Sequence, residues 1–205
     1  RSTSSAASDV YKRQVIDPLE LIEKYSADAL RFTLLSMASP GRDVKLSEDR
    51  VKGYRNFLNK IWNANNFLIQ NDCKFENIET PNDLKLNINK WIFVEFTNTN
   101  EKIKKSIDSY RFDEAARIAY QFVWHSFCDW YLELSKTVFY SENNENIEET
   151  RNVASFIFTQ ILVILHPFIP FLTEEIWLKN KLDKDGKDFL MLKNWSEASS
   201  NKDKD

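Results

Sequence analysis

Hydrophobic residues recur at helical spacing along most of this 205-residue chain. Asp17-Pro18 has the cap residue and the first-position proline of a helix start, and Ser26 precedes a second short helix that Pro40 and Gly41 end. The pattern then predicts longer helices over about 47–71, 88–109, 111–140 and 147–166, followed by a short one over 170–180. The helix over 111–140 is apolar on most sides through its middle, so we expect it to be the central one.

The scarcity of turn residues indicates the fold class. Three Gly and five Pro are too few for a sandwich or barrel, so we predict an all-α protein, an antiparallel helical bundle preceded by a short helical linker unit. Residues 1–14 are rich in Ser and Ala and lack an apolar period, and we interpret them as a non-native scar. Residues 181–205 are predicted to form a C-terminal extension that is partly disordered, with at most one short strand.

Several kinds of chemistry find no support in the sequence. No apolar run reaches the ~20 residues of a membrane helix, and no Gly-rich phosphate loop occurs, so we expect no ATP site in this chain. Cys73 and Cys128 lack partners at ligand spacing, and we interpret them as free thiols in a reducing cytoplasm, with no metal bound. His125, Asp129 and Glu133 repeat at one-turn spacing; without a nucleophile nearby, we expect a buried hydrogen-bonded ladder rather than a catalytic set.

The predicted helix over 47–71 has two chemically distinct faces. One face holds Tyr54, Phe57, Leu58, Ile61, Leu68 and Ile69, and the opposite face holds Asn56, Asn59, Lys60, Asn63, Asn66, Gln70 and Phe67. Amides match the donors and acceptors of base edges, and an exposed ring stacks on a base with about 1–3 kcal/mol, so this face suits single-stranded RNA. Alternatively, Phe67 packs beneath the following loop or another helix, and spacing alone leaves both interpretations open. The basic run KIKK at 102–105 is a weaker candidate for phosphate contacts, since a solvated helix face explains it more simply.

Three longer stretches resemble a known family: VIDPLELIEKYSADALRFTLLSMASPGRDVKLSEDRVKGYRNFLNKIWNANNFLI, FCDWYLELSK and HPFIPFLTEEIW. Over about residues 15–195 the chain resembles the valyl-tRNA synthetases, which are class I aminoacyl-tRNA synthetases. Isoleucyl- and leucyl-tRNA synthetases share the ADALR-like and HPFIPFLTEEIW-like segments and stay as alternatives, as does a helical-bundle protein-interaction module. The resemblance implies linker helices that contact the tRNA stem over 15–45 and an anticodon-binding helical bundle over 46–180.

The resemblance also implies that the helix over 47–71 faces the anticodon, at positions that include Asn63 and Phe67, in agreement with the helical face described above. Together, the candidates for anticodon binding are Asn59, Asn63, Asn66 and Phe67, and the candidates for tRNA backbone contacts are Arg42 and Lys60. Two positions depart from the family pattern. Ser26 stands where the family usually has Gly, and Asn66 stands where an arginine is common, which removes a cation close to the anticodon loop.

A protein of this family attaches valine to tRNA(Val) with ATP and Mg, and its catalytic and editing domains would lie before Val15. The resemblance therefore implies that this chain is inactive alone, holds no cofactor and positions tRNA in the cytoplasm. The expected partners are tRNA(Val) and the catalytic domain of the same protein, with no membrane and no DNA. Because phosphate neutralisation supplies most protein–RNA affinity, a net charge of -3 predicts weak RNA binding by the isolated chain.

Overall fold

The computed structural model describes residues 17–39, 41, 46–75, 78–180 and 189–195, and the described part is helical without any strand. The predicted scar over 1–14 and the candidate Arg42 lie outside the described residues. In chain order the elements are α2 (Pro18–Tyr25), α3 (Ala27–Met37), α4 (Glu48–Gln70), α5 (Asn87–Asp108), α6 (Phe112–Gln121), η1 (Phe122–Tyr131), α7 (Leu132–Phe139), α8 (Asn144–Leu165), α9 (Pro170–Lys179) and η2 (Leu190–Leu192). The all-α prediction and the order of the predicted helices are confirmed.

Short polar side chains begin several of the helices. The carboxylate of Asp17 accepts a hydrogen bond from Leu19 N at 2.8 Å at the start of α2. Ser26 ends α2 and caps α3, and it does so with a positive φ of 93°. Asn143 caps α8, whereas Ser47 makes no side-chain cap bond at the start of α4. The starts of α2, α3 and α8 therefore follow from local chemistry that the sequence displays.

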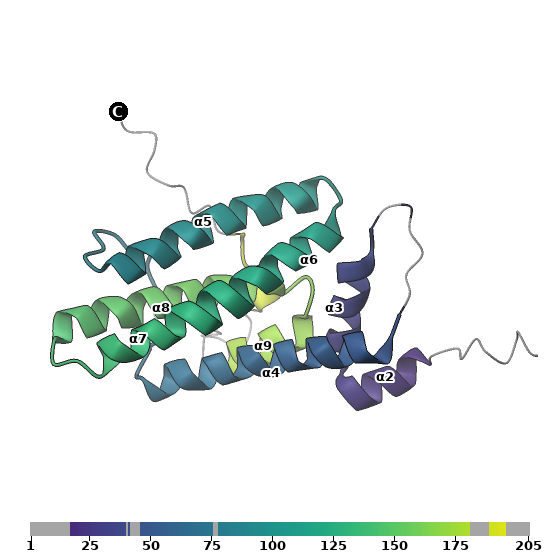
Figure 1. Cartoon of the computed structure of the whole chain (residues 1–205), viewed down its shortest axis with the longest axis horizontal. Helices are drawn as coiled ribbons and strands as arrows, with labels where there is room; N and C mark the ends of the chain where they lie inside the picture. The colour runs from purple at the N-terminus through teal and green to yellow at the C-terminus, as the bar shows by residue number, and fades with distance from the viewer. Residues whose placement is uncertain (1–16, 40, 42–45, 76–77, 181–188, 196–205) are drawn as a thin grey trace, which may run out of the picture.

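One continuous helical run extends from α6 through η1 to α7, and η1 is a π-helical segment within it. A π segment widens the helix locally and shifts the side chains that follow it. The prediction that this run is the central helix is wrong. Trp130 in η1 is 62% exposed, whereas α8 lies behind the run and between α4 and α5 (Figure 1). Most of α8 is buried, namely Ile147, Thr150, Val153, Ala154, Ser155, Phe156, Ile157, Phe158, Thr159, Ile161, Leu162, Ile164 and Leu165.

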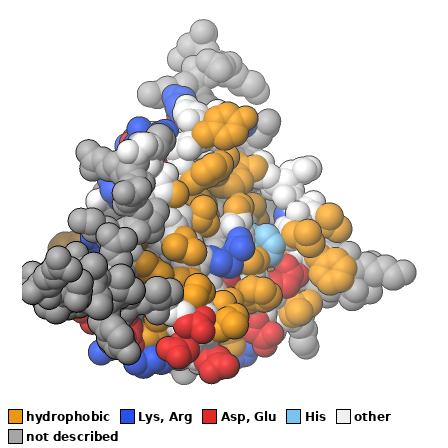
Figure 2. Space-filling view, turned by 90° about the vertical axis from the view of Figure 1, so that its right-hand side faces the viewer, with side chains coloured by type: hydrophobic (Ala, Val, Ile, Leu, Met, Phe, Trp, Pro, Cys, Tyr) orange, Lys and Arg blue, Asp and Glu red, His pale blue; other side chains and the backbone are white. Residues whose placement is uncertain are grey.

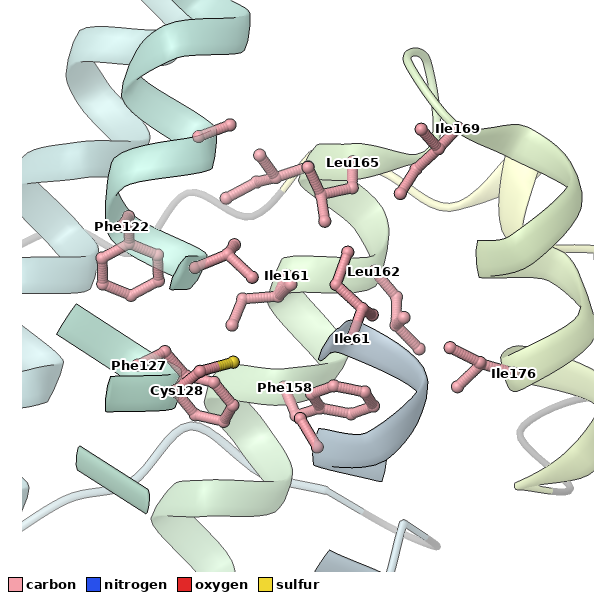
Figure 3. Packing of buried hydrophobic residues seen from close by; sticks show 14 of the residues in the cluster. Ile61, Phe122, Phe127, Cys128, Phe158, Ile161, Leu162, Leu165, Ile169 and Ile176 are labelled. Atoms are coloured by element: carbon pink, nitrogen blue, oxygen red, sulfur yellow. The ribbon is translucent and has the colours of Figure 1, made fainter. Parts of the chain in front are cut away.

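The core is built from aliphatic and aromatic side chains of α8 and of its neighbours. Figure 3 shows Phe158, Ile161 and Leu165 of α8 meeting side chains of α4, η1 and the segment around α9. Close packing of this kind leaves little tolerance for changes in side-chain volume. The bundle therefore holds α4, α8 and the α6–η1–α7 run in fixed relative positions.

The short helices α2 and α3 pack into the same core. The ring of Phe32 is fully buried, with its centroid 4.8 Å from that of Tyr54 and 5.3 Å from that of Phe57 in α4. Asp28 accepts hydrogen bonds from the backbone nitrogens of Phe171 at 3.3 Å and Leu172 at 2.7 Å, in the first turn of α9. These contacts join the predicted linker unit to the bundle, and the boundary at 45/46 stays a prediction.

The C-terminal stretch packs against the bundle where it is described. Leu190 of η2 is buried, and Trp195 Nε1 donates a hydrogen bond to Asn100 Oδ1 at 2.6 Å. An apolar hollow of about 460 Å³ lies between α3, the α5–α6 turn and Trp195. Hydrophobic side chains gather on the end of the molecule where α3 and this turn lie (Figure 2). Among the described helices, none combines the length and the apolar character that crossing a bilayer requires.

Candidate nucleic-acid interface

The helix α4 has a buried stripe and an exposed stripe, but the boundary differs from the helical-wheel prediction. Ile69, predicted to be in the core, is 43% exposed. Asn65 is fully buried instead, and Asn180 Nδ2 donates a hydrogen bond to its side-chain oxygen at 2.7 Å. Asn59 and Asn63 are exposed and lie one helical turn apart. These two amides are therefore free to contact a ligand along the outer edge of α4.

The remaining candidates of α4 lie on its two flanks. Lys60 and Phe67 are two turns apart and point to η1 and α7, where they contact Asp129 and Phe139. Asn66 lies one turn after Trp62 on the other flank. The ammonium of Lys179 in α9 lies 4.3 Å from the centroid of the Trp62 ring. The structure thus brings Asn59 and Asn63 together, with Lys60 and Phe67 on one side of them and Asn66 on the other.

Phe67 is partly buried rather than isolated among amides. Its ring centroid lies 6.2 Å from that of Phe139 in α7, and the ammonium of Lys136 lies 5.7 Å from the Phe67 ring. Of the two interpretations that the spacing left open, the second describes this ring, because packing against a second helix covers part of it. Whether the uncovered part stacks on a base stays a prediction.

Lys60 belongs to a charged cluster that bridges α4 and η1. Its ammonium forms an ion pair with Asp129 and lies 4.4 Å from the centroid of the Trp124 ring. Asp129 also lies 3.2 Å from Nδ1 of His125. Burial acts to raise the pKa of Asp129, but the hydrogen bonds and charges of Lys60 and His125 lower it below the usual value. A phosphate that contacts Lys60 must therefore compete with a carboxylate already in place.

The predicted ladder of three residues forms only in part. His125 and Asp129 are in contact, but the His125 side chain is 60% exposed, so the pair is not buried. Glu133 takes no part in it, because its carboxylate binds Lys136 at 2.7 Å. Trp124 and Lys136, which shape this surface, were not identified as candidates. The sequence shows how far Trp124 lies from Asp129 and Lys136 from Glu133 along the chain. It does not show that η1 and α7 pack on α4, which is what brings these side chains to the surface of α4.

The other singled-out residues have structural surroundings. Cys73 and Cys128 are free thiols, and burial raises the pKa of each to about 12. Lys102 and Lys105 are exposed on α5. No group of three or more metal-binding side chains occurs within the described ranges.

Comparison with known proteins identifies the family to which the chain belongs. Residues 89–205 match the family described as the anticodon-binding domain of tRNA ligase. The chain belongs to this family. It is also 66% identical over 192 residues to the valine–tRNA ligase of Pelagibacter ubique, covering 94% of the chain and 22% of that protein. The valine–tRNA ligase of Agrobacterium fabrum is 46% identical over 187 residues, which cover 91% of the chain and 20% of that protein.

The family members that match are much longer than this chain. The chain spans about a fifth of the length of the curated relatives it matches. Both relatives are named valine–tRNA ligase, which favours the valine enzymes over the isoleucyl- and leucyl-tRNA synthetases and over a protein-interaction module. The predicted resemblance to the valyl-tRNA synthetases is confirmed. One solved structure, the LeuRS–tRNA–LeuAMS ternary complex from Agrobacterium radiobacter, has a TM-score of 0.63 at 17% identity and covers 88% of the chain and 21% of that structure's chain. This likeness shows that the fold is shared.

Proposed function

We propose that this chain is the part of a valine–tRNA ligase that binds the anticodon stem-loop of tRNA(Val). The observation that carries the proposal is the exposed pair Asn59 and Asn63 on α4, in a chain of the anticodon-binding family. Each amide offers a donor and an acceptor that a loop base can meet on its Watson–Crick or Hoogsteen edge. Two such groups one turn apart suit neighbouring bases of a loop.

The flanks of α4 would complete the contact. Phe67 would contribute the uncovered part of its ring to base stacking, and Asn66 would contribute a further amide from the opposite flank. Lys60 would contact a backbone phosphate after separating from Asp129. Because Asp129 already neutralises Lys60 and the net charge is -3, base contacts rather than phosphate contacts would decide which loop binds.

In the whole ligase, ATP with Mg would activate valine on the catalytic domain, and the amino acid would then pass to the tRNA. This chain would act by binding and orientation, since correct placement of the anticodon end helps to hold the acceptor end at the distant catalytic site. Its partners would be tRNA(Val) and the catalytic domain of the same protein, and its compartment would be the cytoplasm.

A fluorescence anisotropy titration tests this proposal. The chain is titrated into a labelled anticodon stem-loop of tRNA(Val) and into the same stem-loop with its anticodon bases exchanged. We expect weaker binding of the exchanged loop by about tenfold or more, because the loss of a specific base contact costs roughly 1–3 kcal/mol. Equal affinity for the two loops would show that the chain does not recognise the anticodon.

A further inference from the structure

A second groove lies on the other side of the α6–η1 helix from α4. It has a volume of about 570 Å³ and runs between α5 and α6–η1, which lie side by side in Figure 1. Its lining includes Lys102, Lys105, Arg117 and His125. The run KIKK, which the anticodon site leaves unused, thus contributes two of its three lysines to this groove.

The two lysines are available for a new partner. Lys102 and Lys105 are exposed, and neither forms an ion pair with another described residue. Arg117 is partly engaged, with Glu114 at 3.5 Å and Gln121 at 3.2 Å. These two contacts use only part of the Arg117 guanidinium, so N–H groups remain that can donate to a phosphate oxygen.

The groove also contains groups of other kinds. Glu95 and Glu114 contribute negative charge, so the groove is moderately rather than strongly basic. Gln121 supplies an exposed neutral amide, whereas Thr99 and Ser106 are buried and Ser106 Oγ already donates to the Lys102 carbonyl at 2.9 Å. Mixed cations and neutral donors are typical of surfaces that bind the RNA backbone without recognising sequence.

Two side chains of η1 connect the groove to the α4 surface across the α6–η1 helix. His125 lines the groove and also contacts Asp129, the partner of Lys60 in α4. Packed helices lie about 8–10 Å apart, so two such spacings separate α4 from α5. One RNA stem-loop that places its bases on Asn59 and Asn63 can therefore lay its backbone across the α6–η1 ridge into the groove.

We propose that the groove between α5 and α6–η1 binds the phosphate backbone of the RNA stem, through Lys102, Lys105 and Arg117. This inference rests on the proposed anticodon function and assigns it a second contact surface. The two surfaces have separate tasks: α4 discriminates between loops, and the groove contributes affinity that does not depend on sequence.

The test is a double variant, Lys102→Gln with Lys105→Gln, titrated with the two stem-loops over a range of salt concentrations. We expect both loops to bind roughly tenfold more weakly at low salt, with their affinity ratio unchanged. The slope of log affinity against log salt should become shallower by about 0.7–0.9 for each phosphate that the variant no longer neutralises.

The matched control is Lys90→Gln with Lys104→Gln, which removes the same charge from exposed positions of the same helix outside the groove lining. The control should bind both loops like the wild type. If the groove variant and the control have the same affinity and salt slope while the wild type still discriminates between loops, the groove assignment is wrong and the proposed function stands. If the wild type does not bind the stem-loop at all, both fail together.

Discussion

The serine between α2 and α3 gives a sharp test of the backbone geometry. Ser26 has φ 93° and ψ 153°, a conformation that glycine adopts easily and that strains a residue with a Cβ atom. Its hydroxyl offsets part of this strain, because it accepts a hydrogen bond from Ala29 N at 3.3 Å and so caps α3. Glycine would relieve the strain and alanine would remove only the cap, so replacing the serine by each of them separates the two effects.

The expected magnitudes follow from these contacts. Ser26→Gly removes strain of about 1–3 kcal/mol, loses a few tenths of a kcal/mol of capping, and costs about 0.5–1 kcal/mol in chain entropy. We expect a net stabilisation of about 1 kcal/mol, which raises the melting temperature by roughly 2–4 °C for a chain of this size. Ser26→Ala keeps the strain and loses the cap, so it should destabilise the fold by about 1 kcal/mol.

Urea unfolding of the three proteins, followed by far-UV circular dichroism, measures these differences. The stability order should be glycine, then serine, then alanine, with equal dependence of the free energy of unfolding on urea concentration. If the glycine variant is no more stable than the alanine variant, the backbone at this position is not strained and the reasoning is refuted.

Three further outcomes are expected. Tyr131→Phe should lower the free energy of unfolding by about 1–3 kcal/mol in urea titrations, because it removes the buried hydroxyl that donates to Asn89 Oδ1 at 2.9 Å; wild-type stability would contradict this. Burial raises the pKa of the Cys73 and Cys128 thiols to about 12, so these thiols should react with iodoacetamide only after unfolding. Rapid labelling of the native chain would disprove their burial. Burial also raises the pKa of Asp28 above the usual value of 3.8, despite its two backbone amide donors. The contribution of Asp28 to the free energy of unfolding should therefore fall as the pH rises from 3.8 through the raised pKa. The variant Asp28→Asn should lack this part of the pH dependence of unfolding, and identical pH profiles of the variant and the wild type would refute the prediction.

Helix positions could be predicted because the signals that set them are local. Asp17-Pro18 begins α2 and Ser26 begins α3 as the sequence indicated. A helix is determined by spacing and capping within a few residues, so one sequence suffices to locate it. The relative burial of the helices is not local, and the choice of the 111–140 run over α8 as the central helix failed for that reason.

The candidate surface could be predicted only in outline. Helical spacing identified Asn59 and Asn63 as exposed, since they lie opposite the apolar stripe of α4. The surroundings of Phe67 stayed open because its partner Phe139 is distant in sequence, and Lys60 pairs with Asp129, 69 residues away. Contacts of this range depend on how two helices pack, which periodicity within one helix does not encode.

Recognition of the anticodon loop by the exposed amides of α4 can be measured as a ratio of two affinities. The affinity ratio between the tRNA(Val) stem-loop and the base-exchanged stem-loop is compared for the wild type, for Asn59→Ala with Asn63→Ala, and for Asn98→Ala, an exposed amide on α5. We expect the ratio to fall to about one in the double variant only, because the tRNA(Val) loop then binds more weakly, by roughly 1–3 kcal/mol per lost base contact. A ratio that stays at the wild-type value in the double variant would contradict this recognition.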